Sequence, residues 1–242
     1  MTKKLLVINP NTSAEMTKDI QTTINQIKDF DMDVTVTMPD FGPQSLESFY
    51  DYSLAAFGCI RLVQKVGEDY DGILVSCYGD PGLFSLKEIC DYPVIGIAEA
   101  SIALSTIMGQ KFSLLVASHK AVPMMEDMVN QYGFQSRLAS IEPIGVSVLE
   151  IEKDKKASIA KLSAVGAKAI EKGGEVLILG CAGMTGMKEE LETELGVPVI
   201  DPVEYGYLLL EMMVKNHCPI SKIGLYKQPD QKKISKLEIL IN

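Results

Sequence analysis

Short apolar segments alternate with longer segments of helical period along this chain. Eight runs rich in Val, Ile and Leu predict buried strands, over residues 4–9, 33–38, 71–76, 93–97, 112–117, 136–142, 175–179 and 197–200. Apolar residues at helical spacing predict helices between them, among others over 53–66, 122–132 and 156–172. The last two helices are each followed by glycine, the residue that commonly ends a helix. This alternation predicts an α/β fold with parallel strands and helices on the sheet faces.

The first helix is expected soon after the first strand. Thr12 and Glu15 have the spacing of a capping box, in which two side chains satisfy the free N–H groups of a helix N-terminus. Apolar residues then recur at helical spacing, at Met16, Ile20, Ile24 and Ile27. We therefore predict a helix with Thr12 at its N-cap.

The second half of the chain repeats the first. The segment DGILVSCYG (71–79) matches EVLILGCAG (175–183), and YPVIGIAE (92–99) matches VPVIDPVE (197–204) at almost the same offset. Upstream, Leu-Leu-Val occurs in both halves and is followed each time by a polar loop and a helix. The repeat predicts two similar α/β lobes. We place the first lobe at residues 1–98 plus 206–242 and the second at residues 99–205.

Each copy of the repeat has a cysteine directly after a buried strand. These residues, Cys77 and Cys181, are each followed two positions later by glycine. In open α/β sheets ligands bind at the carboxyl ends of the strands. If the lobes face each other about a pseudo-two-fold axis, the two cysteines reach one cleft from opposite sides. The alternative is that both are small core residues, because Cys is often fully buried, but their matching positions favour a catalytic pair.

Two opposed thiols suit the inversion of a stereocentre. A thiolate removes a proton from one face of the carbon, a thiol donates a proton to the other face, and the roles exchange in the reverse reaction. Backbone N–H groups in the turns after the cysteines are expected to hold the substrate carbonyl as negative charge develops. No metal-ligand spacing and no nucleotide fingerprint accompanies the pair. We therefore predict chemistry without a metal or a cofactor.

Composition excludes several function classes. A formal net charge of -9 argues against a nucleic-acid partner, because such surfaces need clustered Lys and Arg. No apolar run approaches the roughly 20 residues that span a bilayer, so we expect no membrane partner. The apolar run 5–8 is too short for a signal-peptide core. The five cysteines are odd in number and lack zinc-site spacing, so we expect free thiols and a cytoplasmic location.

Four further polar residues near strand ends have two interpretations each. Asp80 precedes a proline, the order typical of a helix N-cap and first turn, so capping is favoured over the role of an active-site acid. Its contact with a ligand would then be made by its backbone. Glu99 and Glu204 recur at matching positions and either cap helices, which is favoured, or orient the thiols. His119 follows a strand and either contacts the ligand or faces solvent.

Six motifs run in order over nearly the whole chain. They are INPNTS (8–13), SCYGDPGL (76–83), PVIGIAEA (93–100), IGVSVLEIE (144–152), LGCAGM (179–184) and GVPVIDPV (196–203). Together they resemble the aspartate/glutamate/hydantoin racemase superfamily, specifically its hydantoin and allantoin racemase branch. The resemblance implies two pseudo-symmetric flavodoxin-like lobes with the active site in the cleft between them, no cofactor, and a homo-oligomer. It also implies that Cys77 and Cys181 are the acid/base residues, one for each face of the chiral carbon.

The same resemblance implies which residues bind the substrate. They are Asn11 and Thr12 in the first loop, Tyr78, Gly79 and Asp80 beside the first cysteine, Ser118 in the loop after strand 112–117, and Ala182 and Gly183 beside the second cysteine. Where the family commonly has two threonines, this chain has Ala117 and Ser118. The expected substrate is a small cyclic ureide. Met184, Met187 and Tyr78 suggest an apolar wall, which favours 5-substituted hydantoins over allantoin.

Other functions stay open from the sequence. Within the superfamily the alternatives are a decarboxylase or isomerase of small diacids, which resembles a single-cysteine enzyme, and an amino-acid racemase. The latter usually has acidic residues beside the thiols, whereas the first loop here has Asn9 and Asn11. Outside it, a non-catalytic small-molecule binding module also suits a two-lobed α/β shape. The presence of both cysteines favours the racemase.

Overall fold

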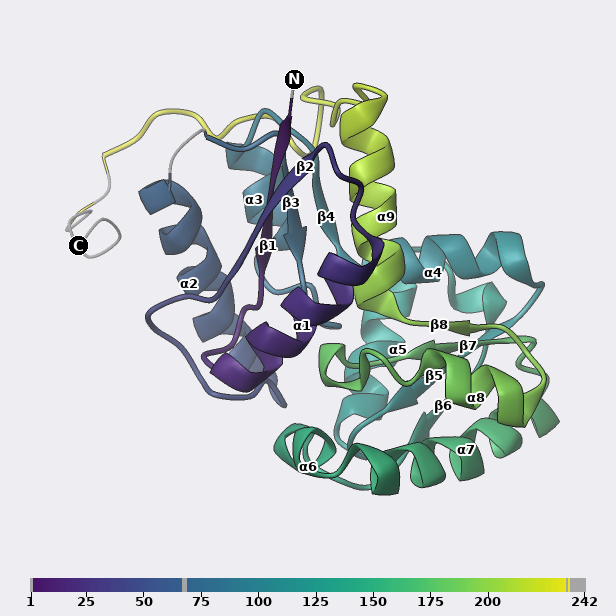
Figure 1. Ribbon diagram of the computed structural model, residues 1–242. Coiled ribbons are helices and arrows are strands. Elements are labelled where there is room, and N and C mark those ends of the chain that lie inside the picture. The colour runs from purple at the N-terminus through teal and green to yellow at the C-terminus, as the bar shows by residue number, and fades with distance from the viewer. Residues whose placement is uncertain (1, 67–68, 234, 236–242) are drawn as a thin grey trace.

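Two four-stranded parallel sheets form the framework of the protein in the computed structural model, which describes residues 2–66, 69–233 and 235 (Figure 1). The first sheet has the order β2-β1-β3-β4 and the second the order β6-β5-β7-β8. The strands are β1 (Lys3–Ile8), β2 (Met32–Thr37), β3 (Gly72–Val75), β4 (Val94–Gly96), β5 (Phe112–Val116), β6 (Leu138–Pro143), β7 (Val176–Leu179) and β8 (Val199–Ile200). All eight predicted strands and the α/β class are confirmed.

The two sheets have the same topology, as expected for a repeated unit. β3 and β7, which precede the two cysteines, lie at equivalent inner positions, and every residue of both strands is buried. Helices cover both faces of a parallel sheet, so its inner strands are continuous apolar runs rather than alternating ones. For this reason these segments could be identified as strands from their sequence.

The described part of the chain has nine α-helices, eight of them between consecutive strands and the ninth after β8. They are α1 (Ala14–Ile27), α2 (Phe49–Val66), α3 (Leu83–Ile89), α4 (Ile97–Met108), α5 (Ala121–Gln131), α6 (Val148–Lys153), α7 (Lys155–Glu171), α8 (Lys188–Leu195) and α9 (Pro202–Lys215), with short 3-10 helices η1 (Gln135–Arg137) and η2 (Ala182–Met184). The predicted helices 122–132 and 156–172 match α5 and α7 to within one residue. The predicted helix 53–66 begins earlier, at Phe49.

The N-cap of α1 is Ser13 and not Thr12 as predicted. The Ser13 hydroxyl accepts a hydrogen bond from Met16 N at 3.1 Å, and its backbone is extended. Thr12 lies one residue outside the helix, where its N–H donates to Pro43 O. Both residues have the hydroxyl that an N-cap needs. The N-cap therefore lies one residue later than predicted, and the predicted Thr12–Glu15 capping box is wrong, because the residue three positions after Ser13 is Met16.

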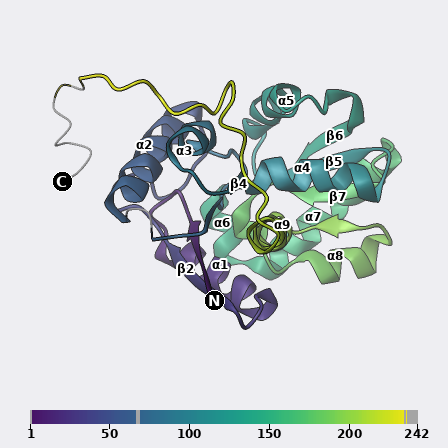
Figure 2. The same cartoon turned by 90° about the horizontal axis from the view of Figure 1, so that it is seen from above.

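Two helices cross between the sheets. α4 follows β4 of the first sheet but packs against β5 and β7 of the second, while α9 follows β8 of the second sheet and packs against α1, β3 and β4 (Figure 1). α4 and α9 also pack against each other, as Figure 2 shows with α9 seen end-on. The crossing helices join the two halves. The predicted boundaries at residues 98/99 and 205/206 stay a prediction, and residues 236–242 of the first predicted lobe lie outside the described part of the chain.

After α9 the chain runs back over the first sheet and contacts α3 (Figure 2). The Lys222 ammonium donates hydrogen bonds to the carbonyl oxygens of Lys87, Glu88 and Cys90, at the C-terminus of α3. Carbonyl groups in the last turn of a helix lack partners within the helix, so a lysine there satisfies them. Among the described residues, no helix is both long and apolar enough to cross a membrane.

Candidate active site

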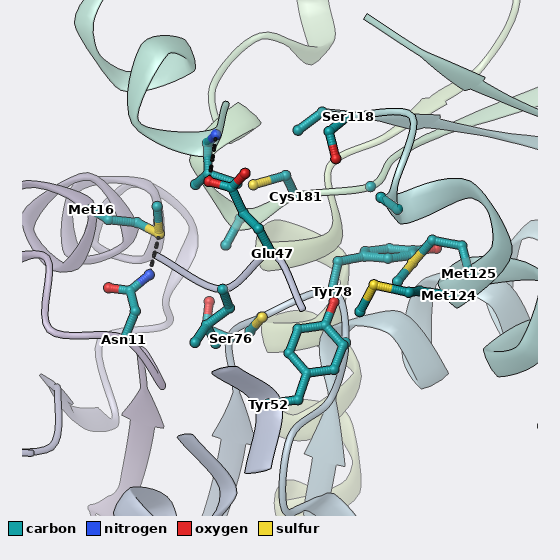
Figure 3. A pocket seen from close by; sticks show the side chains of 18 residues that line it. Asn11, Met16, Glu47, Tyr52, Ser76, Tyr78, Ser118, Met124, Met125 and Cys181 are labelled. Atoms are coloured by element: carbon teal, nitrogen blue, oxygen red, sulfur yellow. Dashed lines mark hydrogen bonds between the residues drawn. The ribbon is translucent and has the colours of Figure 1, made fainter. Parts of the chain in front are cut away.

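A cavity lies where the carboxyl ends of the two sheets meet (Figure 3). Loops that follow β1, β3, β5 and β7 all contribute to its lining, and so do side chains from α2, α5 and α6. It encloses about 590 Å³ of empty space, its open mouth included. Its lining combines many apolar residues with a few polar side chains, a composition typical of a site for a small molecule.

Cys77 and Cys181 both line this cavity, each half-buried in a loop directly beyond an inner strand. The Gly183 N–H donates to Cys181 Sγ at 3.4 Å. In the other half, a hydrogen bond from the Gly79 backbone to Cys77 lowers the pKa of that thiol. Both sulfur atoms therefore receive an N–H from the glycine two residues later, an arrangement that stabilises a thiolate.

Three effects act on the Cys77 thiol. Its enclosure by protein raises its pKa well above the ordinary value, and this is the largest effect. The Gly79 N–H opposes it, whereas negative charge on Cys181 or Asp80 raises the pKa further. Because each charge disfavours the other, a state with one thiolate and one thiol is favoured over two thiolates. With its pKa raised above the ordinary value, Cys77 is a thiol at neutral pH.

Asn11 and Ser76 present polar groups to the cavity. Asn11 Oδ1 accepts hydrogen bonds from Asn9 Nδ2 and Ser13 N, both at 2.8 Å, so the amide is held in place. Among the described residues its Nδ2 donates to a weak acceptor, Met16 Sδ at 3.1 Å (Figure 3). Ser76 Oγ is buried and has no hydrogen-bond partner within the described part of the chain. Both side chains line the cavity and retain hydrogen-bonding capacity that the protein does not fully use.

Tyr52 lies against the turn that follows Cys77. A Cβ on Gly79 would stand 2.3 Å from Cζ of Tyr52, so only glycine leaves room for the ring. Burial raises the pKa of the Tyr52 phenol, and negative charge on Cys77 and Cys181 raises it further. Tyr52 is thus a protonated hydroxyl near both thiols, able to donate a hydrogen bond into the cavity (Figure 3).

Glu47 places a carboxylate in the cavity (Figure 3). Its Oε1 accepts hydrogen bonds from Val148 N at 3.3 Å and from Ser45 Oγ at 3.2 Å. Val148 is the first residue of α6, so the partial positive charge of a helix N-terminus helps to hold this carboxylate. None of the residues that line the cavity, all of them within the described ranges, is Lys, Arg or His.

The apolar part of the lining differs from the predicted wall. Tyr78 lines the cavity as expected, but Met184 and Met187 are buried in the hydrophobic core and do not. η2 and the turn after it direct these two side chains into the hydrophobic core that both halves of the chain share. Other apolar residues take their place, namely Met16, Leu46, Met124, Met125 and Val148.

The structure brings most of the predicted binding residues together. Those that line the cavity are Asn11, Tyr78, Gly79, Ser118 and Ala182. Those outside its lining are Thr12, Asp80 and Gly183. Gly183 nevertheless acts at the site through its N–H group, which contacts Cys181.

Three residues that line the cavity were not predicted from the sequence, namely Glu47, Tyr52 and Ser76. Ser76 directly precedes Cys77 at the end of an inner strand, so its position was a usable signal. Glu47 and Tyr52 have no counterpart in the repeat and follow no strand closely. Packing of α2, which holds Tyr52, and of the segment before it, which holds Glu47, brings them to the cavity.

Asp80 does cap a helix, as predicted, but the helix is α4 and not the predicted helix that follows Pro81. The helix that begins after the proline, α3, has Gly82 as its N-cap and no side-chain capping bond. The Asp80 carboxylate accepts instead from Ala98 N at 3.1 Å and Glu99 N at 2.8 Å, at the N-terminus of α4.

The remaining polar candidates lie away from the cavity. Glu99 pairs with Lys87, and Glu204 pairs with Lys188 at 2.9 Å. Within the described part of the chain, these two side chains accept hydrogen bonds from lysine rather than from the backbone of a helix N-terminus, and neither lines the cavity. His119 is exposed and does not line the cavity either. In the parts of the chain that the structure describes, no three His, Cys, Asp or Glu side chains cluster so as to hold a metal ion.

Known proteins resemble this chain along nearly its whole length. The Asp/Glu/Hydantoin racemase family matches residues 5–209. A hydantoin racemase of Pseudomonas sp. (strain NS671) is 39% identical over 231 residues, which cover 95% of this chain and 93% of the relative. An allantoin racemase structure from Klebsiella pneumoniae is 31% identical, with a TM-score of 0.91 and 99% of each chain covered. The allantoin racemase structure from Pseudomonas fluorescens has a TM-score of 0.92 at 31% identity, covering 96% of this chain and 99% of its own. The chain therefore belongs to the Asp/Glu/Hydantoin racemase family, in the branch of the hydantoin and allantoin racemases, and is an isomerase.

Proposed function

We propose that this protein is a cofactor-independent racemase that interconverts D- and L-5-substituted hydantoins, with Cys77 and Cys181 as its two acid/base residues. The observation that supports this most directly is that two cysteines, at equivalent positions of the two halves, line one cavity and each receive a backbone N–H. A cytoplasmic location, where thiols stay reduced, and a homo-oligomeric state are part of the same proposal.

The proposed reaction moves one proton on each side of C5. The thiolate of one cysteine removes the proton from C5 and becomes a thiol, and the electron pair left on carbon spreads onto the adjacent carbonyl oxygen. The Tyr52 hydroxyl and backbone N–H groups donate hydrogen bonds to that oxygen as charge develops. The thiol of the other cysteine then donates its proton to the opposite face of C5 and becomes the thiolate. Turnover exchanges the two cysteine roles, and the enzyme is ready for the reverse reaction.

The polar groups of the cavity favour a neutral ring over a carboxylate substrate. Glu47 accepts hydrogen bonds, so it suits a ring N–H, while Asn11 Nδ2 and Ser76 Oγ suit ring carbonyl oxygens. An amino acid or a diacid would bring a second negative charge beside Glu47. No cationic residue among those lining the cavity would balance it. This argues against the amino-acid racemase and the diacid decarboxylase or isomerase.

The apolar lining supports hydantoins over allantoin. Met16, Leu46, Met124 and Met125 offer flexible apolar contacts to an alkyl or aryl group at C5, whereas the ureido group of allantoin is polar. Allantoin racemase is the second candidate, because the two solved structures at 31% identity are allantoin racemases.

The proposal is tested with single enantiomers of 5-benzylhydantoin, allantoin and glutamate in deuterated buffer. We expect loss of optical activity with deuterium entering C5 of the hydantoin, slower conversion of allantoin, and no reaction of glutamate. Faster conversion of allantoin would move the assignment to allantoin racemase, and conversion of glutamate would overturn the argument from Glu47. Calorimetric binding of the hydantoin without exchange at C5 would indicate a binding module instead.

The pH dependence of the reaction follows from the Cys77 thiol. Because burial raises its pKa, the Cys77 thiolate is scarce at neutral pH and becomes more abundant as the pH increases. We expect kcat/KM to rise above pH 7 and to fall again once both cysteines are thiolates, since no proton donor is then left. Polarimetric rates from about pH 6 to about pH 10, with circular dichroism as a control for folding, measure this profile. A rate that falls steadily over that range would contradict it.

A further inference from the structure

An aspartate links each cysteine loop to the N-terminus of the helix that crosses to the other sheet. In the second half this residue is Asp201, the N-cap of α9, which accepts from Val203 N at 3.0 Å and Glu204 N at 3.3 Å. The same carboxylate accepts from Thr185 Oγ and Gly186 N, both at 2.8 Å. These two residues follow Cys181, so Asp201 ties the second cysteine loop to α9.

The first half reaches a similar arrangement from a different position. The repeat aligns Asp201 with Gly96, the N-cap of α4, which has no side chain to cap with. Asp80 accepts instead from Ala98 N and Glu99 N, the residues aligned with Val203 and Glu204. A Cβ on Gly96 would lie 2.2 Å from Cγ of Asp80. The Asp80 carboxylate therefore occupies the space that a side chain at residue 96 would need.

Asp80 belongs to the loop that it ties down. Its own N–H donates to Cys77 O at 2.9 Å, and its backbone has φ 42, in the left-handed region. Its carboxylate also accepts from the Tyr132 hydroxyl at 2.7 Å, at the end of α5. The Cys77 loop is thus fixed from two sides by elements of the second half of the chain. Burial raises the Asp80 pKa to about 7, and the hydrogen bonds that the carboxylate accepts from Tyr132, Glu99 and Ala98 oppose that increase.

We propose that Asp80 is a positioning residue for Cys77, the counterpart of Asp201 for Cys181. By anchoring the turn of residues 77–80 to α4 and Tyr132, it holds the Gly79 N–H against the Cys77 thiol. This role rests on the proposed acid/base function of Cys77. It is separate from the capping of α4, which a side chain at residue 96 can provide by itself, as Asp201 does for α9.

The two halves of the chain suggest a variant that separates these roles. Gly96 has φ -99 and ψ 148, close to the extended conformation of Asp201, so an aspartate fits its backbone. Asp80→Ala removes the carboxylate and makes space, and Asp80→Ala combined with Gly96→Asp restores a cap on α4 without an anchor on the cysteine loop. We expect Asp80→Ala to lower Tm by about 2–4 °C and kcat by about tenfold to a hundredfold.

The double variant is expected to recover Tm but not kcat, with KM changed less than twofold or so. Recovery of both Tm and kcat would overturn the proposal, because capping alone would then explain Asp80. Asp154→Ala is the matched control, since Asp154 caps α7 through Ala157 N away from the cavity. It should lower Tm with kcat unchanged. If the alanine variants do not fold, Asp80→Asn provides the test, because it keeps an acceptor for α4. It should still lower kcat clearly while changing Tm little.

A readout without substrate distinguishes failure of this inference from failure of the proposed function. The rate of Cys77 alkylation by iodoacetamide, followed by mass spectrometry against pH, reports the environment of the thiol. We expect the double variant to differ from the wild type in this profile, whether or not the wild type racemises hydantoins. An unchanged profile in the double variant would overturn the positioning role. A wild type that converts neither hydantoins nor allantoin would instead count against the proposed function alone.

Discussion

Replacing either Cys77 or Cys181 with serine is expected to lower the rate of racemisation by about a thousandfold or more, with the fold unchanged. Serine is nearly the same size as cysteine, but its hydroxyl is a far weaker acid and is not a useful base near neutral pH. Both residues are half-buried at the cavity, and Cys181 packs against the edge of the hydrophobic core, so a substitution of nearly equal size disturbs the packing little. Racemisation needs both proton transfers, and each variant loses one of them.

The two variants are also expected to differ from each other. Cys77→Ser keeps the Cys181 thiolate and therefore still exchanges the C5 hydrogen of one enantiomer, without inverting it. Cys181→Ser should exchange the hydrogen of the opposite enantiomer. Proton NMR of the C5 signal in deuterated buffer, for each enantiomer separately, measures this. Cys218→Ser is the control, because Cys218 contacts Asn216 O away from the cavity and should have no effect on the rate. Loss of the same enantiomer's exchange in both cysteine variants would contradict a two-thiol mechanism.

The strands could be predicted because each is a continuous apolar run between polar segments. β7, for example, is Val-Leu-Ile-Leu and is buried throughout. Helix ends were harder to place. α2 begins at Phe49, and its first residues, Phe49 and Tyr50, are 59% and 73% exposed. Large apolar side chains on the solvent side obscure the helical period, so the predicted helix began only at residue 53.

The catalytic candidates could be predicted because the repeat marks them at strand ends, and strand ends in parallel sheets meet at one edge. Asp80 shows the limit of such inference. Its neighbours in sequence predicted a cap for α3, but its left-handed backbone turns the carboxylate toward α4, eighteen residues away. Glu47 and Tyr52 show another limit, because they reach the cavity through packing between segments that share no sequence pattern. Spacing along a chain does not report which helix N-terminus or loop lies alongside.

Gly79→Ala is expected to reduce kcat/KM by about a hundredfold, although it adds a single methyl group. The new Cβ would lie 2.3–2.6 Å from Cζ, Cε2 and the hydroxyl oxygen of Tyr52, much closer than atoms can approach. Either the ring leaves its place beside the thiols, or the turn shifts and the Gly79 N–H no longer reaches Cys77. Both outcomes damage the site, and kcat and KM for 5-benzylhydantoin measure the loss.

A double-mutant cycle with Tyr52 identifies the cause of that loss. Tyr52→Ala removes the ring, so adding Gly79→Ala to it should lower kcat/KM by no more than about twofold further, a strongly non-additive result. Tyr52→Phe keeps the ring and removes only the hydroxyl, so the steric conflict should persist. In that background Gly79→Ala should still cause most of the loss of kcat/KM that it causes in the wild type. If instead the cost of Gly79→Ala is the same with and without the ring, the close approach of Tyr52 is not what requires glycine. The requirement would then lie in the backbone of the turn itself, between Cys77 and the carboxylate of Asp80 that anchors it.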